Sequence, residues 1–522
     1  MSQGDAPVGR YNAAVDLIER NLRVRAAKVA FIDAEGRHTF ADVADRSART
    51  GAALLGLGLA PGDRVALILQ DGIDFVCSFL GAIRAGVVPI PLNTLLPAED
   101  YAYVLADSGA RAAIVSEPIL PVVSQAIAAS RWAGEVIVAG PGGALKPRLE
   151  AASPEAPAHL SRADDVAFWL YSSGSTGRPK GTLHRHGSIG ATAELFGQQV
   201  LGLSEEDIVY SAAKLFFAYG LGNSLLHPMY AGATVVLFPE RVTPEAVFDL
   251  LGRHEVSVFC GVPTLYSALL ASPRLGAPGA SRLRLCLSAG EALPAEIGKA
   301  WSHAMGAEIV DGIGSTEMLH IFLSNRPGQV RYGTTGLAVP GYDLRLVGED
   351  GREVGPAEIG ELYVRGPSLT AGYWNQPEKT RSTFVDGWMR SGDKFERAAD
   401  GYFVHRGRAD DMLKVSGIWV SPVEVEAALV AHEAVLEAAV IGVEDQTGLV
   451  KTKAFVVLRP GAKGGEGMAD ALKQFIKSRL APHKYPRTID FVEALPKTAT
   501  GKIRRHVLRE QEALAVREAP VT

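Results

Sequence analysis

Apolar runs of strand length alternate with helical hydrophobic patterns through the middle of the chain. The runs 256–260 and 283–288 are followed by helical patterns over 263–270 and 294–304. Another helical pattern, 243–251, begins with a threonine that can cap a helix and a proline that suits its first turn. Strands that alternate with helices indicate parallel sheets, in which ligands bind at the carboxyl ends of the strands. The sequence therefore predicts an α/β fold.

The pattern changes towards the end of the chain. After Arg408 it restarts as a small α+β unit, with helical patterns near 423–430 and 468–480. Stretches rich in glycine, proline or alanine at 140–157 and 460–467 indicate surface loops. A chain of 522 residues is also too long for one compact domain. We therefore expect a large N-terminal part and a smaller C-terminal one.

One apolar stretch, 215–239, raises the question of a membrane span. It contains no Asp, Glu, Lys or Arg and is long enough to cross a bilayer. However, polar residues and a proline interrupt its middle at 223–228, and three glycines loosen it further. A buried pocket wall followed by a strand over 233–238 fits these features better, so we predict no transmembrane segment.

Composition narrows the class of protein. A hydrophobic content of 47% with 21% charged residues is ordinary for a soluble globular protein. The net charge of −5 gives no reason to expect nucleic acid or an anionic membrane as a partner. Cys77, Cys260 and Cys286 lie in apolar surroundings without metal or disulfide spacing, which indicates buried reduced thiols in a cytoplasmic protein. The first residues also lack the features of a signal peptide.

The most informative segment for chemistry is 171–181, Y-S-S-G-S-T-G-R-P-K-G, which follows a predicted buried strand. Glycines and small hydroxyls let a backbone curl around phosphate oxygens, and the lysine supplies a positive charge. The segment is not the usual phosphate loop of nucleoside triphosphatases. At the two Gly-Lys pairs of the chain, Leu293 and Pro496 stand where that motif needs its first glycine. Taken alone, the composition is also that of a surface loop.

Six segments, in order, resemble the acyl-adenylate-forming ligases, and the resemblance covers nearly the whole chain. These segments are 171–181, 311–317 (D-G-I-G-S-T-E), 360–374 (G-E-L-Y-V-R-G-P-S-L-T-A-G-Y-W), 391–393 (S-G-D), 407–417 (G-R-A-D-D-M-L-K-V-S-G) and 496–502 (P-K-T-A-T-G-K). Members of this family activate a carboxylate by its attack on the α-phosphate of ATP, which expels diphosphate. The acyl-adenylate then reacts with a thiol such as coenzyme A, and AMP leaves.

The resemblance assigns the nucleotide-binding residues. It implies that Thr316 bonds the α-phosphate, that Glu317 holds Mg²⁺ together with Thr176, and that Asp393 accepts the ribose hydroxyls beside Arg408. The β- and γ-phosphates would contact Ser172, Ser173, Gly174, Ser175, Thr176, Gly177 and Lys180. The adenine would lie against Ser288, Ala289, Gly290, Glu291 and Ala292 and against Asp311, Gly312 and Ile313. Many relatives have an amide at the position of Asp311; a carboxylate there can accept from the adenine amino group.

Lys502 is the leading catalytic residue that the resemblance implies. A lysine in the last motif can reach both the attacking carboxylate and the α-phosphate, where negative charge gathers. The alternative is a solvated lysine of the C-terminal tail, such as Lys484 or Lys497. The match over 496–502, with a glycine directly before Lys502, favours the catalytic role.

The resemblance also implies two domains and two conformations. It places a hinge at Asp410, which divides the chain into an AMP-binding and acyl-substrate domain, 1–409, and a mobile C-terminal domain, 410–522. One conformation would bring Lys502 to the site for adenylation. Rotation about the hinge would then present the catalytic Lys414, with Gly417 leaving room for the arm of coenzyme A.

The segment 214–223, K-L-F-F-A-Y-G-L-G-N, matches the acyl pocket of the family, although aromatic clusters are usually core packing. The pocket residues would be Phe217, Ala218, Tyr219, Gly314, His320 and Ile321. Flat walls and small residues would form a slot for a planar ring, and Tyr219 would block a fatty-acyl tunnel. His320 could bond a ring substituent or be satisfied within the wall. The pocket looks most like that of benzoate–CoA ligases, with 4-hydroxybenzoate–CoA ligases close behind.

Other functions were weighed against an aryl–CoA ligase. An adenylation protein that loads a carrier protein shares the first half-reaction, but the chain shows no attached carrier domain. A non-catalytic acyl-nucleotide-binding protein would be expected to lack Lys502 or Glu317, and both are present. A light-emitting oxidative relative is disfavoured by the compact pocket. Further partners considered are a second copy of the chain in a homodimer and a lysine acetyltransferase acting on Lys502.

Overall fold

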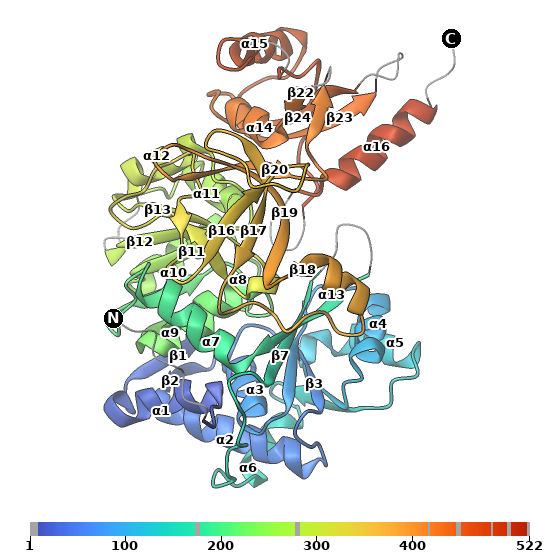
Figure 1. Ribbon diagram of the computed structural model, residues 1–522. Coiled ribbons are helices and arrows are strands. Elements are labelled where there is room, and N and C mark those ends of the chain that lie inside the picture. Colours follow the sequence, from blue (N-terminus) through green and yellow to red (C-terminus); the bar gives the residue numbers. More distant parts are fainter. Residues whose placement is uncertain are drawn as a thin grey trace.

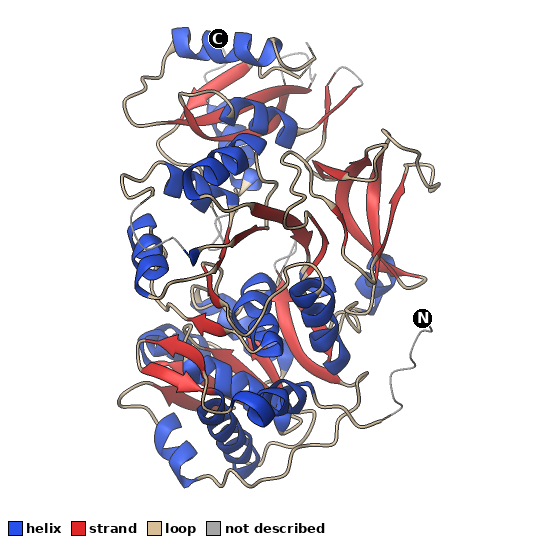
Figure 2. Ribbon diagram, turned by 90° about the vertical axis from the view of Figure 1, so that its left-hand side faces the viewer, coloured by secondary structure: helices blue, strands red, loops and turns tan. Residues whose placement is uncertain are grey.

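A computed structural model describes residues 9–172, 178–276, 282–415, 418–444, 450–481, 484–497 and 503–518. Figure 1 shows the N-terminal part of the chain at the bottom and a smaller C-terminal part at the top. Helices and strands alternate through the large part, as the apolar pattern predicts (Figure 2). The α/β fold is thereby confirmed.

The central element is a nine-stranded sheet. Its order is β15 (Leu337–Ala338), β14 (Ile321–Ser324), β13 (Ile309–Gly314), β12 (Leu285–Ser288), β11 (Val258–Gly261), β9 (Ile208–Ser211), β10 (Thr234–Val236), β1 (Val29–Asp33) and β2 (Gly36–Thr39). All neighbours from β13 to β1 pair in parallel, as expected for strands joined by helices. The connecting helices are α10 (Pro244–Arg253), α11 (Pro263–Leu270) and α12 (Ala295–Met305). Thr243 caps α10, since its side chain accepts from the Ala246 N–H.

A second, fully parallel sheet lies in the N-terminal part. It consists of β4 (Val88–Pro91), β3 (Arg64–Ile68), β5 (Ala112–Ser116) and β6 (Glu135–Ala139). The helices of this part are α1 (Ala13–Arg25), α2 (Phe40–Gly56), α3 (Ile73–Arg84), α4 (Ala98–Ser108), α5 (Leu120–Ala128) and α7 (His186–Thr192). The antiparallel hairpin of β7 (Val166–Ser172) and β8 (Lys180–Arg185) packs beside β4.

The prediction of a surface loop over 140–157 is wrong in part. A short helix, α6 (Leu145–Ala151), lies within it. Leu145 and Leu149 are four positions apart and both are buried, so they form the apolar face that fixes this helix against the core. The glycine and proline content of the segment hides these two leucines from a reading of composition.

An antiparallel sheet continues the large domain. It contains β16 (Asp343–Val347), β17 (Ile359–Arg365), β19 (Trp388–Arg397), β18 (Phe384–Val385) and β20 (Phe403–Arg408), with α13 (Pro377–Thr383) before β18. Strand β20 ends at Arg408, two residues before the predicted hinge. This sheet therefore leads the chain from the central sheet to the C-terminal part.

The C-terminal part is an α+β unit with its own core, as predicted. Its sheet contains β23 (Val435–Glu444), β24 (Val450–Leu458) and β25 (Thr488–Phe491). A separate hairpin is formed by β21 (Leu413–Val415) and β22 (Ile418–Val420). The helices are α14 (Pro422–Val430), α15 (Glu466–Lys477) and α16 (Arg505–Glu518). Side chains such as Val425, Val440 and Leu472 are buried together between these elements. The boundary at Asp410 itself stays a prediction.

The apolar stretch 215–239 forms short elements inside the large domain. These are α8 (Ala218–Leu221), a π-helical turn over Gly222–Leu226, α9 (His227–Ala231) and then β10. Most of its residues are buried in the core clusters beside the sheets. Within the ranges given above, the structure contains no helix with the length and apolarity that a bilayer crossing needs. The predicted strand over 233–238 is confirmed as β10, and the buried wall of a pocket stays a prediction.

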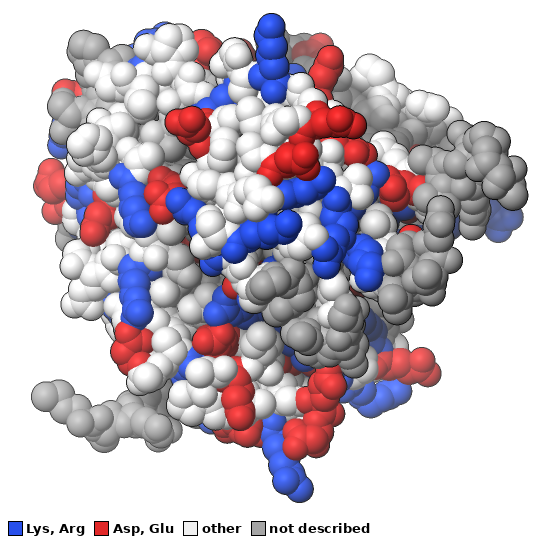
Figure 3. Space-filling view, turned by 90° about the horizontal axis from the view of Figure 1, so that it is seen from above, with Lys and Arg blue, Asp and Glu red and all other residues white. Residues whose placement is uncertain are grey.

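Charge is mixed over the surface that the C-terminal part presents. Figure 3 shows lysine and arginine side chains interspersed with aspartate and glutamate on this face. This view agrees with the small net charge of −5.

Candidate active site

The β7–β8 hairpin holds both ends of the predicted phosphate loop. Ser172 at the end of β7 lies opposite Lys180 at the start of β8. The hydroxyl of Tyr171 donates to Asp107 of α4 at 2.6 Å, which fixes the base of the hairpin. The Oγ atom of Ser172 is buried and has no hydrogen-bond partner among the described groups.

Five of the predicted phosphate contacts cannot be placed. Ser173, Gly174, Ser175, Thr176 and Gly177 lie outside the described residues. The structure thus positions the two ends of the loop, Ser172 and Lys180, and leaves its middle as a prediction.

Lys180 and Glu317 meet beside a tyrosine. The Lys180 Nζ atom lies 3.2 Å from Oε1 of Glu317. Tyr373 stands between them, since its hydroxyl accepts from Lys180 Nζ at 2.8 Å and donates to Glu317 Oε1 at 2.8 Å. Burial raises the pKa of Glu317, but the Lys180 charge and the Tyr373 hydroxyl outweigh it and hold the pKa below its ordinary value. Glu317 is therefore an anion at neutral pH.

Tyr373 is not among the site residues predicted from the sequence. The residue lies in the G-Y-W end of the third motif, and that position is the sequence signal for it. Its backbone N–H donates to Thr380 Oγ1 at 3.0 Å, and its ring packs against Phe384 with centroids 5.3 Å apart. These contacts hold the phenol in place between the two charged groups.

The predicted magnesium site can be tested against the residues that are described. Among them, no three His, Cys, Asp or Glu side chains gather as a metal cluster. Magnesium is commonly bound by one or two carboxylates together with substrate phosphates, and the anionic Glu317 beside the phosphate loop fits that mode. The second proposed ligand, Thr176, is among the residues not described, so magnesium stays a prediction.

The predicted adenine contacts gather at the ends of β12 and β13. Ser288 and Asp311 are opposite each other in the parallel pair of these strands. Asp311 is only 5% exposed, and its Oδ1 atom has no hydrogen-bond partner in the described part of the chain. Burial raises the pKa of this carboxyl well above its ordinary value. Burial therefore favours the protonated form of Asp311 more than an exposed site would, and the predicted contact with adenine stays a prediction.

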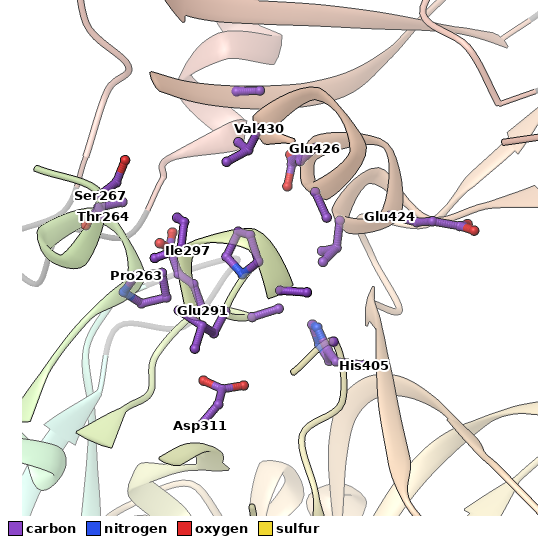
Figure 4. A pocket seen from close by; sticks show the side chains of 18 of the residues that line it. Pro263, Thr264, Ser267, Glu291, Ile297, Asp311, His405, Glu424, Glu426 and Val430 are labelled. Atoms are coloured by element: carbon purple, nitrogen blue, oxygen red, sulfur yellow. The ribbon is translucent and has the colours of Figure 1, made fainter. Parts of the chain in front are cut away.

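Asp311 lies at the base of a cavity of about 260 Å³ between the two domains (Figure 4). The loop after β12, with Glu291 and Ala292, forms one side, and His405 of β20 forms another. Ala289, Gly290, Gly312 and Ile313 lie in the same two strand-end segments. Gly290 has φ of +95°, a conformation that suits glycine and turns the loop across the strand ends.

The ribose residues are also brought together. Asp393 in β19 faces Arg408 in β20, and the guanidinium lies 3.5 Å from the carboxylate. His405, which the sequence did not single out, lies 3.4 Å from the same carboxylate. Gly392 has φ of +75°, and a Cβ there would come within 2.9 Å of the Arg408 side chain. Arg408 also lies 3.5 Å from the predicted hinge residue Asp410, so it contacts both the ribose site and the hinge.

The predicted acyl pocket residues come from two facing segments. Phe217, Ala218 and Tyr219 lie at the start of α8, and the Tyr219 hydroxyl donates to the Gly261 carbonyl at 3.2 Å. The ring of Tyr219 stacks on that of His320 with centroids 5.8 Å apart. Gly314 approaches the His320 backbone so closely that a Cβ would overlap it, and Ile321 follows as the first residue of β14.

The structure is compatible with both roles predicted for His320. Its Nε2 atom lies 3.3 Å from the Tyr219 carbonyl, and its ring makes an edge contact with His227 at 4.4 Å. Burial lowers the pKa of His320 to about 4, so the ring is neutral. With Nε2 donating to the carbonyl, Nδ1 is a lone-pair acceptor with no partner among the described groups.

The predicted C-terminal site residues are only partly described, but a neighbouring residue of that domain reaches the cavity. Lys502 and Gly417 lie outside them, and of Lys414 only the backbone, in β21, is described. Ile503, which directly follows Lys502, donates its backbone N–H to Glu291 Oε1 at 2.7 Å. The residue that directly follows the last motif therefore contacts the predicted adenine loop.

Comparison with known proteins agrees with this geometry. The model of the AMP-binding enzyme family matches residues 18–374, and that of the AMP-binding enzyme C-terminal domain matches 424–502. A benzoate–CoA ligase of Thauera aromatica is 55% identical over 96% of each chain. A 4-hydroxybenzoate–CoA/benzoate–CoA ligase of Rhodopseudomonas palustris is 49% identical over 97% of this chain and 95% of the other.

A solved structure extends the likeness to three dimensions. A benzoate CoA ligase from Burkholderia xenovorans superposes with a TM-score of 0.91 at 51% identity, over 96% of this chain and all of the other. The resemblance seen in the six motifs and the expected two-part architecture are thereby confirmed. Because both family models match and a relative is 55% identical over nearly the whole length, the chain belongs to the AMP-binding enzyme family.

Proposed function

We propose that the protein is an AMP-forming aryl acid–CoA ligase, which converts benzoate, ATP and coenzyme A into benzoyl-CoA, AMP and diphosphate. The observation that carries this proposal is the 55% identity to a benzoate–CoA ligase over nearly the full length of the chain. The predicted acyl-pocket segment supports it, because Phe217, Ala218 and Tyr219 lie together at the start of α8 and the Tyr219 ring stacks on His320. Flat aromatic walls of this kind suit a planar ring.

The first half-reaction is adenylation. A carboxylate oxygen of benzoate attacks the α-phosphorus of ATP, the bond to the β-phosphate oxygen breaks, and diphosphate leaves with the released electron pair. Lys180 faces the departing phosphates from the start of β8, and Thr316 donates to the α-phosphate. Lys502 neutralises the charge that gathers on the attacking carboxylate and the α-phosphate. Magnesium held by Glu317 and Thr176 would supply further charge neutralisation at the phosphates.

Nucleotide recognition follows from the two strand-end segments. Asp311 lines the cavity, and its carboxyl oxygen can accept from the adenine amino group at a position where many relatives have an amide. Asp393 accepts the ribose hydroxyls, and Arg408 and His405 orient its carboxylate. The base and the ribose are thereby held on either side of the interdomain cavity.

The second half-reaction is thioester formation. The coenzyme A thiol loses its proton, the sulfur attacks the acyl carbon of benzoyl-adenylate, and the bond to the AMP oxygen breaks. The C-terminal domain must first move Lys502 away, which we assign to rotation about Asp410. Lys414 and Gly417 then line the passage of the coenzyme A arm. The pair of Arg408 with Asp410 supports a hinge that senses the ribose site.

A substituted benzoate, above all 4-hydroxybenzoate, is the second candidate substrate. The observation that favours it is the 49% identity to a ligase named for both acids. The unpartnered Nδ1 atom of His320 could accept from a ring hydroxyl. The preference between the two acids therefore depends on whether His320 Nδ1 can reach a hydroxyl group on the bound ring.

The test is a substrate panel with two acceptors. Purified protein would be incubated with ATP, magnesium and benzoate, hydroxybenzoates, aminobenzoates or cyclohexanecarboxylate, and diphosphate release would be measured. Coenzyme A or an aryl carrier protein would then be added as acceptor. Release with benzoate and transfer to coenzyme A are expected. Transfer to the carrier protein alone would overturn the CoA ligase, and no release with any aryl acid would overturn the adenylating function.

Lysine acetylation is a proposed form of regulation. Acetylation of Lys502 by a lysine acetyltransferase would remove the charge of this side chain and stop adenylation.

The cysteines bear on the proposed compartment. All three are free and buried, which supports a reducing compartment such as the cytoplasm.

A further inference from the structure

The two domains are joined at the interdomain cavity by a hydrogen bond from the C-terminal backbone to the large domain. Ile503 donates its N–H to the Glu291 carboxylate at 2.7 Å, a length typical of a charge-assisted bond. Figure 4 shows Glu291 on the large-domain side of the cavity, with Glu426 of α14 across it. Since Ile503 is the neighbour of Lys502 in sequence, this bond fixes the backbone beside the predicted catalytic lysine.

An ion pair within the C-terminal domain holds the chain next to Ile503, the residue that donates this hydrogen bond. Arg505, at the start of α16, forms a paired contact with Glu426 at 2.6 and 3.0 Å. Burial lowers the pKa of Arg505, but Glu426, Asp411 and Glu291 outweigh it and keep the pKa above its ordinary value. The segment from Ile503 to Arg505 is therefore tied to the body of the C-terminal domain, and its hydrogen bond to Glu291 sets where that domain sits.

The acceptor side belongs to the predicted adenine loop. Glu291 directly follows Gly290, whose φ of +95° turns the loop over the end of β12. A second polar contact, from Ser267 Oγ of α11 to the Leu436 carbonyl at 3.2 Å, lies along the same crevice.

We propose that Glu291 is a positioning residue for the adenylation half-reaction: its carboxylate docks the backbone of Ile503, the residue that follows the predicted catalytic lysine in sequence. The inference rests on the proposed function and deepens it. The same bond must break when the C-terminal domain rotates for thioester formation, so Glu291 assists one half-reaction and not the other. Its place in the adenine loop links docking to the presence of nucleotide.

The test compares Glu291→Ala, Glu291→Gln and the control Glu296→Ala in the full-length protein. Glu296 is a glutamate of α12 on the same loop-helix segment, exposed and paired only locally with Lys299 in the contacts described. Benzoate-dependent exchange of labelled diphosphate into ATP measures adenylation. Formation of benzoyl-CoA from supplied benzoyl-adenylate measures the second half-reaction.

For Glu291→Ala we expect exchange to fall about 10- to 100-fold through kcat, because a hydrogen bond to a charged group is lost. The KM for ATP and the rate of thioester formation should change less than about threefold. Glu291→Gln keeps an oxygen acceptor and should recover most of the exchange. Hydrogen exchange at the Ile503 amide should be slow in the parent protein with ATP and fast in Glu291→Ala.

Several outcomes would overturn the inference. An equal loss of both half-reactions in Glu291→Ala would indicate a merely structural role, and a rise confined to the KM for ATP would indicate an adenine contact. Glu291→Gln as weak as Glu291→Ala, with both folded by thermal melting, would also contradict docking. Failure of the proposed function is distinct: there the parent protein itself would show no exchange with any aryl acid.

Discussion

The hydroxyl of Tyr373 donates to Oε1 of Glu317 at 2.8 Å. The same hydroxyl accepts from the ammonium of Lys180 at 2.8 Å, so one phenol holds the predicted metal ligand and the phosphate-loop lysine together. Its ring is in turn fixed by Phe384. A residue of the third motif thereby contacts residues of both the first and the second motif.

Tyr373→Phe should lower the adenylation rate about tenfold or more, because a hydrogen bond to a charged group contributes about 1.5–3 kcal/mol. The concentration of magnesium needed for half-maximal rate should rise, since Glu317 is less well oriented. Diphosphate exchange over a magnesium titration measures both effects. Tyr363→Phe, on β17, is the matched control and should behave like the parent. An unchanged magnesium requirement in Tyr373→Phe would refute the orienting role.

Lys502→Ala should abolish diphosphate exchange, by about a thousandfold, because the charge at the α-phosphate is removed. Thioester formation from supplied benzoyl-adenylate should persist. The control is Lys497→Ala in the same motif, since Lys497 is paired with Glu437 at 2.6 Å. Equal loss of both half-reactions in Lys502→Ala would contradict the assignment.

Asp311→Asn should raise the stability of the protein at neutral pH. Burial raises the folded-state pKa above the ordinary value of 3.8, so the folded state binds a proton that the unfolded state has released. In the parent protein, stability is therefore lost as pH rises from about 3.8 towards the raised pKa, and the amide avoids this loss. Thermal melting from pH 5 to pH 8 should show an advantage of the variant that grows with pH.

The same substitution tests nucleotide recognition. An amide keeps one donor and one acceptor, so Asp311→Asn should bind ATP at pH 7 within about threefold of the parent. Asp311→Ala is the comparison that removes both groups and should bind more weakly. Tighter binding by the parent than by Asn at high pH would show that the ionised form is the one that recognises adenine.

Gly222→Ala should impair the acyl pocket. A Cβ at Gly222 would overlap the ring of His320, which stacks on Tyr219. Overpacking of this kind costs about 1–3 kcal/mol, and the displaced ring narrows the slot. The KM for benzoate should rise about tenfold or more while the KM for ATP stays nearly constant. Gly56→Ala, where a Cβ meets nothing within 4 Å, is the control, and a normal benzoate KM in Gly222→Ala would contradict the packing argument.

Local patterns predicted much of the fold. The helical pattern over 263–270 coincides with α11, and the strand before the phosphate loop coincides with β7 within a residue. These succeed because apolar periodicity and capping are properties of neighbouring residues. Where apolar residues were few, as at α6, the pattern was too short to stand out from a loop.

The sequence by itself determined the α/β alternation, the order of the six motifs and the family, because these depend on residue types at short spacings. Only the tertiary structure decided that Tyr373 joins Lys180 to Glu317, that burial raises the pKa of Asp311, and that Glu291 meets Ile503. Those relationships join residues far apart in the chain, 193 positions in the case of Lys180 and Tyr373 and 212 for Glu291 and Ile503. These contacts and the pKa shift depend on burial and on which strands lie side by side. The spacing of residues along the chain gives neither of these.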